Sequence, residues 1–216
     1  MTMPSTHEHT VARLLADATP VRRLWSPEAR LALWLTLEIV AIAAAVVFGL
    51  RADVAVDMRQ PRLLVEIALC MAAGAIAAAV ALRAAVPGRR SAPLVAAFWA
   101  VLACALALVA SVDADTTPSD SSFVASGIQC VASILAFAAL PWAALFVAVR
   151  RGAPLAAPVA GLYAGAAAFL FAAAAVRIAC PIDARLHVLT WHVGTMAIGT
   201  ALSAVAGARW LTRWAG

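Results

Sequence analysis

Residues 153 to 176 read APLAAPVAGLYAGAAAFLFAAAAV, a run of 24 residues that contains no charged side chain. At 1.5 Å per residue a helix of this length reaches about 36 Å, which is enough to cross a hydrocarbon core of about 30 Å. Apolar and polar residues do not alternate along the run, so a transmembrane β-strand is disfavoured. Because backbone polar groups in lipid must be satisfied within the segment, the run predicts a transmembrane helix.

Five further apolar runs flank this one. Over the whole chain 65% of residues are apolar and 12% are charged, with a mean hydropathy of +0.94, against roughly 45–50% apolar residues in soluble domains. The sequence therefore predicts an all-α fold, a polytopic six-helix transmembrane bundle over residues 31–216 that follows a cytoplasmic N-terminal segment, residues 1–30. The six expected helices are Leu31–Leu50, Leu63–Leu82, Ala92–Val112, Phe123–Val149, Ala153–Val176 and Leu186–Ala208.

The N-terminal segment contains a short amphipathic pattern. Four apolar residues are spaced i, i+3, i+4, i+7, as on one face of a helix: Val11, Leu14, Leu15 and Ala18. Thr10 would cap this helix and Pro20 would end it. So short a helix is marginal in water and needs a surface to cover its apolar face. That surface is either the bilayer and the bundle or a soluble partner.

The arginines predict the orientation. All sixteen basic residues are arginine; eleven lie in the N-terminal segment, the second and fourth loops and the C-terminal end, and five in the other three loops. Since basic residues favour the cytoplasmic side, we expect a multi-pass protein of a bacterial inner membrane with both termini cytoplasmic. The net charge of +5 then reflects these loops, and we expect no direct contact with nucleic acid.

Small residues on the last two runs indicate close helix contacts. Gly161 and Gly165 form a small-xxx-small pair, and the last run carries a ladder of four small residues at the same spacing: Thr195, Gly199, Ser203 and Gly207. Such residues allow helix backbones to approach closely in membranes. We expect contacts within one chain rather than dimerisation.

Residues 177 to 192, RIACPIDARLHVLTWH, hold a cysteine and both histidines that lie outside the N-terminal tail. In the predicted topology one outer layer of the membrane collects the reactive side chains Glu66, Cys70, Cys130, Cys180, His187 and His192. The two histidines are five residues apart, about 140° around an α-helix, so we expect them to face different sides and not to chelate one ion as a pair.

Three interpretations of the outer cysteines stay open. Cys130 and Cys180 would form a disulfide in an oxidising compartment, and reversible formation would make a redox switch. Cysteines and one histidine from different helices would instead hold a metal. In the third interpretation Cys130 is a small buried hydrophobe and Cys180 a loop residue. Cys70 and Cys104 are expected in the core.

Two acidic residues fall within the expected helices. Glu38 lies about 10 Å along the first helix, and Glu66 lies near the opposite face of the membrane. A carboxylate in lipid is costly and should face the bundle interior. We expect each to pair locally with a hydroxyl, a histidine or an arginine.

Several short motifs, in their order along the chain, resemble the NrsF-type membrane anti-sigma factors. These six-helix proteins are negative regulators of an extracytoplasmic-function sigma factor. The resemblance covers nearly the whole chain and rests on Leu14-Leu15-Ala16-Asp17, Pro20-Val21-Arg22-Arg23-Leu24, Ala85-Val86-Pro87-Gly88, Cys130, Arg150-Arg151-Gly152-Ala153-Pro154, Cys180-Pro181 with Asp183, and Trp191-His192.

The resemblance implies that the N-terminal segment holds the sigma factor, through the residues Val11, Leu14, Leu15, Ala18, Arg22 and Arg23. It also implies that Cys130 and Cys180 sense metal or oxidative stress, and we add His192 as a sensing residue. The family often carries a histidine where this chain has Ala179, which weighs against a histidine-assisted metal site. We expect a regulator, not an enzyme, with no cofactor, no catalytic residue and no metal ligand.

Two other classes of function remain as alternatives. A membrane thiol oxidoreductase would also use outer cysteines, but normally needs an adjacent redox pair. A small transporter would need paired intramembrane charges and preferably an internal repeat.

Overall fold

The computed structural model describes residues 6–16, 23–49, 61–89, 91–111 and 120–212. All regular structure within these ranges is helical, which confirms the all-α prediction. The elements are α1 Thr6–Ala16, α2 Pro27–Gly49, α4 Pro61–Ala84, α5 Ala92–Ala110, α6 Asp120–Arg150, α7 Ala157–Ala179, α8 Arg185–His187, the π-helix η1 Val188–Val193, and α9 Gly194–Trp210.

Five helical segments in the described part of the chain are long and apolar enough to cross a membrane. They are α4, α5, α6 from Ser122, α7, and the continuous helix formed by α8, η1 and α9. They coincide with five of the six predicted runs. Helix α2 has 23 residues and covers the remaining run, but it is not among the five, so the count of six spans stays a prediction.

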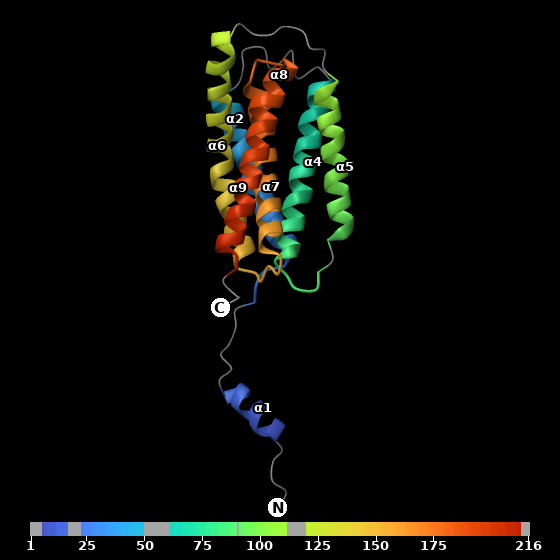
Figure 1. The fold of residues 1–216 in the computed structure, drawn as a ribbon, viewed down its shortest axis with the longest axis vertical. Coiled ribbons are helices and arrows are strands. Elements are labelled where there is room, and N and C mark those ends of the chain that lie inside the picture. Colours follow the sequence, from blue (N-terminus) through green and yellow to red (C-terminus); the bar gives the residue numbers. More distant parts are fainter. Residues whose placement is uncertain (1–5, 17–22, 50–60, 90, 112–119, 213–216) are drawn as a thin grey trace, which may run out of the picture.

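Helix α7 lies at the centre of the bundle. It packs against α2, α4, α6 and α9, while α5 packs on the outside of α4 (Figure 1). Every residue from Tyr163 to Arg177 is buried. The sequence is compatible with this position, because α7 is apolar on all sides and its alanines let the neighbouring helices approach closely.

The closest approach is between α7 and α9. A Cβ atom added at Gly161 would lie 2.5 Å from the Ser203 carbonyl oxygen and 2.8 Å from Gly207 Cα. The Ser203 hydroxyl donates to the Gly161 carbonyl at 2.6 Å and accepts from the Trp142 indole at 2.8 Å. The two predicted sets of small residues thus meet each other within one chain, as expected.

Helix α2 is attached to α6 by two side chains. The Arg30 guanidinium donates to the Ala148 carbonyl at 2.8 Å, and the Trp34 indole donates to the Pro141 carbonyl at 2.9 Å. Glu38 is buried, with 2% of its surface exposed, so it faces the bundle as predicted. Its expected local partner is not found for Oε1, which has no hydrogen bond among the described residues.

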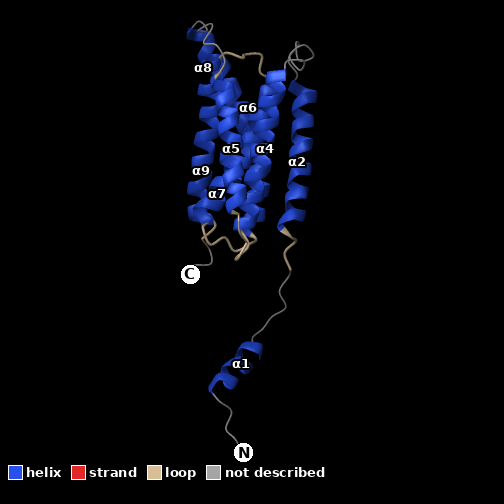
Figure 2. Cartoon of the chain, turned by 90° about the vertical axis from the view of Figure 1, so that its right-hand side faces the viewer, coloured by secondary structure: helices blue, strands red, loops and turns tan. Residues whose placement is uncertain are grey.

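Helix α1 lies apart from the bundle (Figures 1 and 2). It begins at Thr6 and ends at Ala16, so Thr10 lies inside it and is not the cap that the sequence suggested. Val11, Leu14 and Leu15 are 53%, 67% and 70% exposed. Arg23 is also exposed, whereas Ala18 and Arg22 lie outside the described residues.

The start of α2 and the end of α9 lie at the same end of the bundle, and α8 lies at the opposite end (Figure 1). This arrangement is the one expected if both termini occupy one side of a membrane. The end of the bundle that carries α8 is therefore the end remote from α1.

Replacement of Gly161 by alanine tests the α7–α9 contact. The added methyl group would overlap backbone atoms of Ser203 and Gly207, which cannot move aside as a side chain can. We expect a loss of about 1–3 kcal/mol of stability, measured by thermal unfolding of the purified protein in detergent. The matched control is Gly194→Ala on α9, where the nearest atom is 3.8 Å away. Equal unfolding temperatures for the two variants would contradict the packing.

Candidate thiol and histidine site

Four side chains that can bind metals or react with oxidants meet at the end of the bundle that carries α8. Cys130 comes from α6, Cys180 directly follows α7, His187 ends α8 and His192 lies in η1. Their exposed fractions are 7%, 5%, 0% and 1%. One ligand-type atom from each residue lies within 4.8 Å of the other three. We call this group the thiol–imidazole cluster.

Three short distances define the cluster. The Cys130 thiol donates to Cys180 Sγ at 3.6 Å. His187 Nε2 lies 3.4 Å from Cys130 Sγ and 3.6 Å from Cys180 Sγ. The two cysteines are not joined by a disulfide, and their sulfur atoms are close enough for a small side-chain movement to join them.

The expected divergence of the two histidines is wrong. It assumed α-helical geometry, but the segment between them is the π-helix η1, whose hydrogen bonds join residues five apart. Residues at i and i+5 therefore lie nearly one above the other. The His187 and His192 ring centroids are 5.5 Å apart. Both rings belong to one site.

Local sequence explains how the cluster is positioned. Pro181 has no N–H group and cannot continue α7, and it favours the extended backbone seen at Cys180, with φ −78° and ψ 122°. The chain therefore turns away directly after Cys180. On the other side Gly127 of α6 leaves room for the Trp191 indole, which a Cβ atom there would overlap. The centroid of the Phe123 ring lies 5.4 Å from the centroid of the Trp191 indole.

A buried ion pair holds the loop beside the cluster. Arg177 Nε donates to Glu66 Oε1 at 2.8 Å, and Nη2 lies 2.9 Å from Asp183 Oδ1. The Arg177 and Glu66 side chains are only 7% and 3% exposed, while Asp183 is 48% exposed. Arg177 thereby connects α4 to the loop that contains Cys180. Glu66, expected from the sequence to pair locally, is paired with an arginine.

The surroundings of Cys180 favour its thiolate. A hydrogen bond from the Cys130 thiol lowers the pKa of the Cys180 thiol, and His192 lowers this pKa further, while burial acts in the opposite direction. The thiolate is the form that attacks oxidants and binds metals. Cys180 is therefore the more reactive of the two cysteines.

The structure brings together the three predicted sensing residues, Cys130, Cys180 and His192. It adds His187, which the α-helical angle had excluded from a shared site. Cys70 is buried as expected, but Cys104 is exposed on α5, so its assignment to the core is wrong. The error follows from the composition of α5, which is apolar on every face and does not reveal which side meets the bundle.

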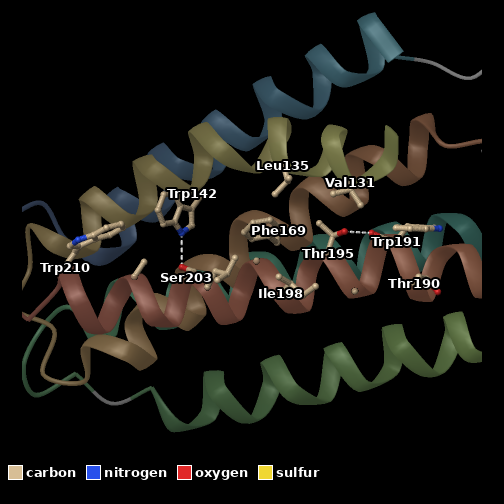
Figure 3. A pocket seen from close by; sticks show the side chains of 14 residues that line it. Val131, Leu135, Trp142, Phe169, Thr190, Trp191, Thr195, Ile198, Ser203 and Trp210 are labelled. Carbon is tan, nitrogen blue, oxygen red and sulfur yellow. Dashed lines mark hydrogen bonds between the residues drawn. The ribbon is translucent and has the colours of Figure 1, made fainter. Parts of the chain in front are cut away.

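A groove of about 590 Å³ lies beside the cluster, between α6 and α9 over α7 (Figure 3). Its lining is apolar apart from a few hydroxyls and indoles, among them Trp142, Trp191, Thr195 and Ser203. The Thr195 hydroxyl donates to the Trp191 carbonyl at 2.5 Å. No residue that lines the groove is titratable, so the chemistry belongs to the buried cluster.

The fold and this site define a polytopic helical protein with helices suited to a membrane and a buried thiol–imidazole cluster near one end. The family model described as NrsF, negative regulator of sigma F, matches residues 14–214. The chain belongs to this family, and membership implies negative regulation of a sigma factor. Comparisons with curated proteins and with solved structures gave no match.

Replacing Glu66 by alanine tests the ion pair. The change leaves the buried Arg177 with Asp183 alone, and we expect a loss of about 3 kcal/mol of stability, measured by thermal unfolding in detergent. Exchanging both members, Glu66→Leu with Arg177→Met, should restore most of this loss, because no buried charge is then left without its partner.

The matched control is Glu28→Ala, which removes an exposed glutamate that lies 3.6 Å from Arg83. Its unfolding temperature should stay close to that of the unmodified chain. If the Glu66 and Glu28 variants lost stability equally, Arg177 would not depend on Glu66.

Proposed function

We propose that this protein is a membrane-bound anti-sigma factor that sequesters an extracytoplasmic-function sigma factor through its N-terminal segment. It releases that partner when oxidants or metals modify Cys130 and Cys180. The observation that carries the proposal is the family match over residues 14–214. The separation of α1 from the thiol–imidazole cluster supports a division between partner binding and sensing (Figure 1).

The partner-binding surface is the apolar face of α1 with the residues that follow it: Val11, Leu14, Leu15, Ala18, Arg22 and Arg23. The exposure of Val11, Leu14 and Leu15 supports this assignment, since three apolar side chains on a short helix gain stability by binding in a partner's groove. Arg22 and Arg23 add electrostatic attraction to acidic residues at the edge of the partner's groove. Binding keeps the sigma factor at the membrane and away from core polymerase.

In this proposal the chain crosses a bacterial inner membrane six times, with α2 as the first span and both termini cytoplasmic. The length of α2 supports its role as a span, and so does the burial of Glu38 toward the bundle. The arginine distribution supports the orientation. The thiol–imidazole cluster then lies near the periplasmic face, where oxidising conditions allow disulfides.

Sensing starts at the two thiols. A two-electron oxidant such as hydrogen peroxide joins Cys130 Sγ to Cys180 Sγ; the two thiols lose two electrons and two protons, and the peroxide is reduced to two water molecules. The new bond ties α6 to the end of α7. Release follows if this state binds the partner less tightly, and a difference of about 1.4 kcal/mol gives tenfold weaker binding.

We propose a regulator rather than an enzyme or a transporter. The pairing of Glu66 with Arg177 supports a structural role for that acid. No chain of acidic groups links Glu38 to Glu66 among the residues described here, which leaves a proton pathway without support.

Introduction of negative charge on α1 tests the partner-binding face. The double variant Leu14→Asp, Leu15→Asp should reduce co-purification of the sigma factor at least about tenfold, because two buried apolar contacts are replaced by hydrated carboxylates. Deleting residues 1–27 should abolish co-purification. The control is Leu155→Asp, which changes a leucine that is 84% exposed, more than Leu14 or Leu15, in the loop between α6 and α7. Binding retained by the deletion variant would move the interface elsewhere.

Replacement of both cysteines by serine tests the sensor. The variant Cys130→Ser, Cys180→Ser cannot form the disulfide, so peroxide should no longer induce the regulated promoter in a reporter strain. The control Cys70→Ser, Cys104→Ser removes the same number of thiols outside the cluster and should leave induction intact. Unchanged induction in the first variant would rule out the thiol mechanism.

A further inference from the structure

We propose that Cys130, Cys180, His187 and His192 together bind one divalent ion of the zinc or cadmium type in a tetrahedral site of two thiolates and two imidazoles. The proposal deepens the sensing function above, and rests on it for the consequence of binding but not for binding itself. It replaces the expectation that the chain has no metal ligands. The π-helix η1 is the feature that makes four ligands available.

The distances among Cys130, Cys180 and His187 fit a tetrahedral ion. Bonds of about 2.3 Å to sulfur and about 2.05 Å to nitrogen place tetrahedral ligands about 3.8 Å apart for two sulfurs, about 3.6 Å for sulfur and nitrogen, and about 3.3 Å for two nitrogens. The observed separations are 3.6 Å between the sulfurs, and 3.4 Å and 3.6 Å from the sulfurs to His187 Nε2. The fourth ligand atom, from His192, belongs to a group whose members lie within 4.8 Å of one another, and a small movement of its ring would bring it to bonding distance.

Both imidazoles are buried, and three of their four ring nitrogens have no hydrogen bond within the described part of the chain. His187 and His192 are 0% and 1% exposed. Among the described residues, His187 Nδ1 and both ring nitrogens of His192 have no hydrogen bond. Buried polar nitrogens are normally satisfied. Coordination of one ion satisfies a nitrogen of His192 and engages His187 Nε2, which already points between the two sulfurs.

Charge and ligand type select the class of ion. Binding of M²⁺ displaces the two thiol protons to solvent, so two thiolates and the divalent cation form a site of zero net charge. A neutral site is compatible with burial among apolar helices. Thiolate and imidazole ligands prefer zinc, cadmium and similar ions, whereas magnesium and calcium require oxygen ligands.

Metal binding and disulfide formation exclude each other at this site. Joining the two sulfurs removes both thiolate ligands, so peroxide oxidation releases the ion and leaves only the two imidazoles. Metal and oxidant thus act on the same two thiols but leave them in different states. In the metal-bound state α6, the end of α7 and η1 are all tied to one ion.

Metal titration of the full-length protein in detergent or nanodiscs tests the proposal. Cadmium should bind at one ion per chain with a thiolate-to-cadmium charge-transfer band, and cobalt should give the visible bands of tetrahedral coordination. His187→Gln and His192→Gln should each weaken binding at least about tenfold; Cys130→Ser or Cys180→Ser should reduce the charge-transfer band, and the double variant should abolish it. The matched controls His9→Gln and Cys104→Ser should bind as the unmodified chain does.

Zinc-edge X-ray absorption of the unmodified protein counts ligands without any substitution, so a variant that fails to fold does not decide the question. Two sulfurs and two nitrogens are expected. Sulfur ligation without imidazole, octahedral cobalt spectra or no stoichiometric binding would overturn the site. Co-purification of the sigma factor, measured separately, distinguishes the two proposals. If the protein binds its partner but no metal, only the proposed metal site is wrong. If it binds metal but its affinity for the partner does not change, only the proposed metal sensing is wrong.

Discussion

The burial of α7 along its whole stretch from Tyr163 to Arg177 is the constraint on which the rest of the structure depends. Its many alanines and glycines let four helices pack closely on it, and its larger side chains Phe169 and Phe171 fit against Gly199 and Gly74 of the neighbouring helices. Without a hydrophobic force between helices in lipid, such close contact is a main source of stability. The positions of Arg177 and Cys180 follow from it, because both lie at the end of this fixed helix.

The same apolar surroundings explain how polar groups are arranged at that end. A charge among these helices needs a partner, and Arg177 has one carboxylate from α4 and another from the loop after Cys180. At this end of the bundle the buried charge of Arg177 is therefore paired.

Hydrophobic runs were sufficient to predict the helices, because lipid solvates only one kind of segment. Depth along those helices was sufficient to bring Cys130 and Cys180 into one layer. The position of His187 was not predictable in this way, since one π-helical turn changes the angle between residues five apart. Cys104 shows a second limit. An apolar pattern without a polar face does not reveal which side of a helix meets lipid.

Among the four residues of the cluster, Cys130 lies on α6, the helix that is separated from α9 by the groove. Helix α9 is fixed to α7 by the contact of Gly161 with Gly207, whereas the groove of about 590 Å³ lies between α6 and α9. The other end of α6 accepts hydrogen bonds from Arg30 and Trp34 of α2, the helix that follows the N-terminal segment. Coupling between distant sites travels through such packed and hydrogen-bonded elements. A displacement of α6 at Cys130 would therefore reach α2 through two defined contacts, whereas a displacement of α9 would first have to break its packing on α7.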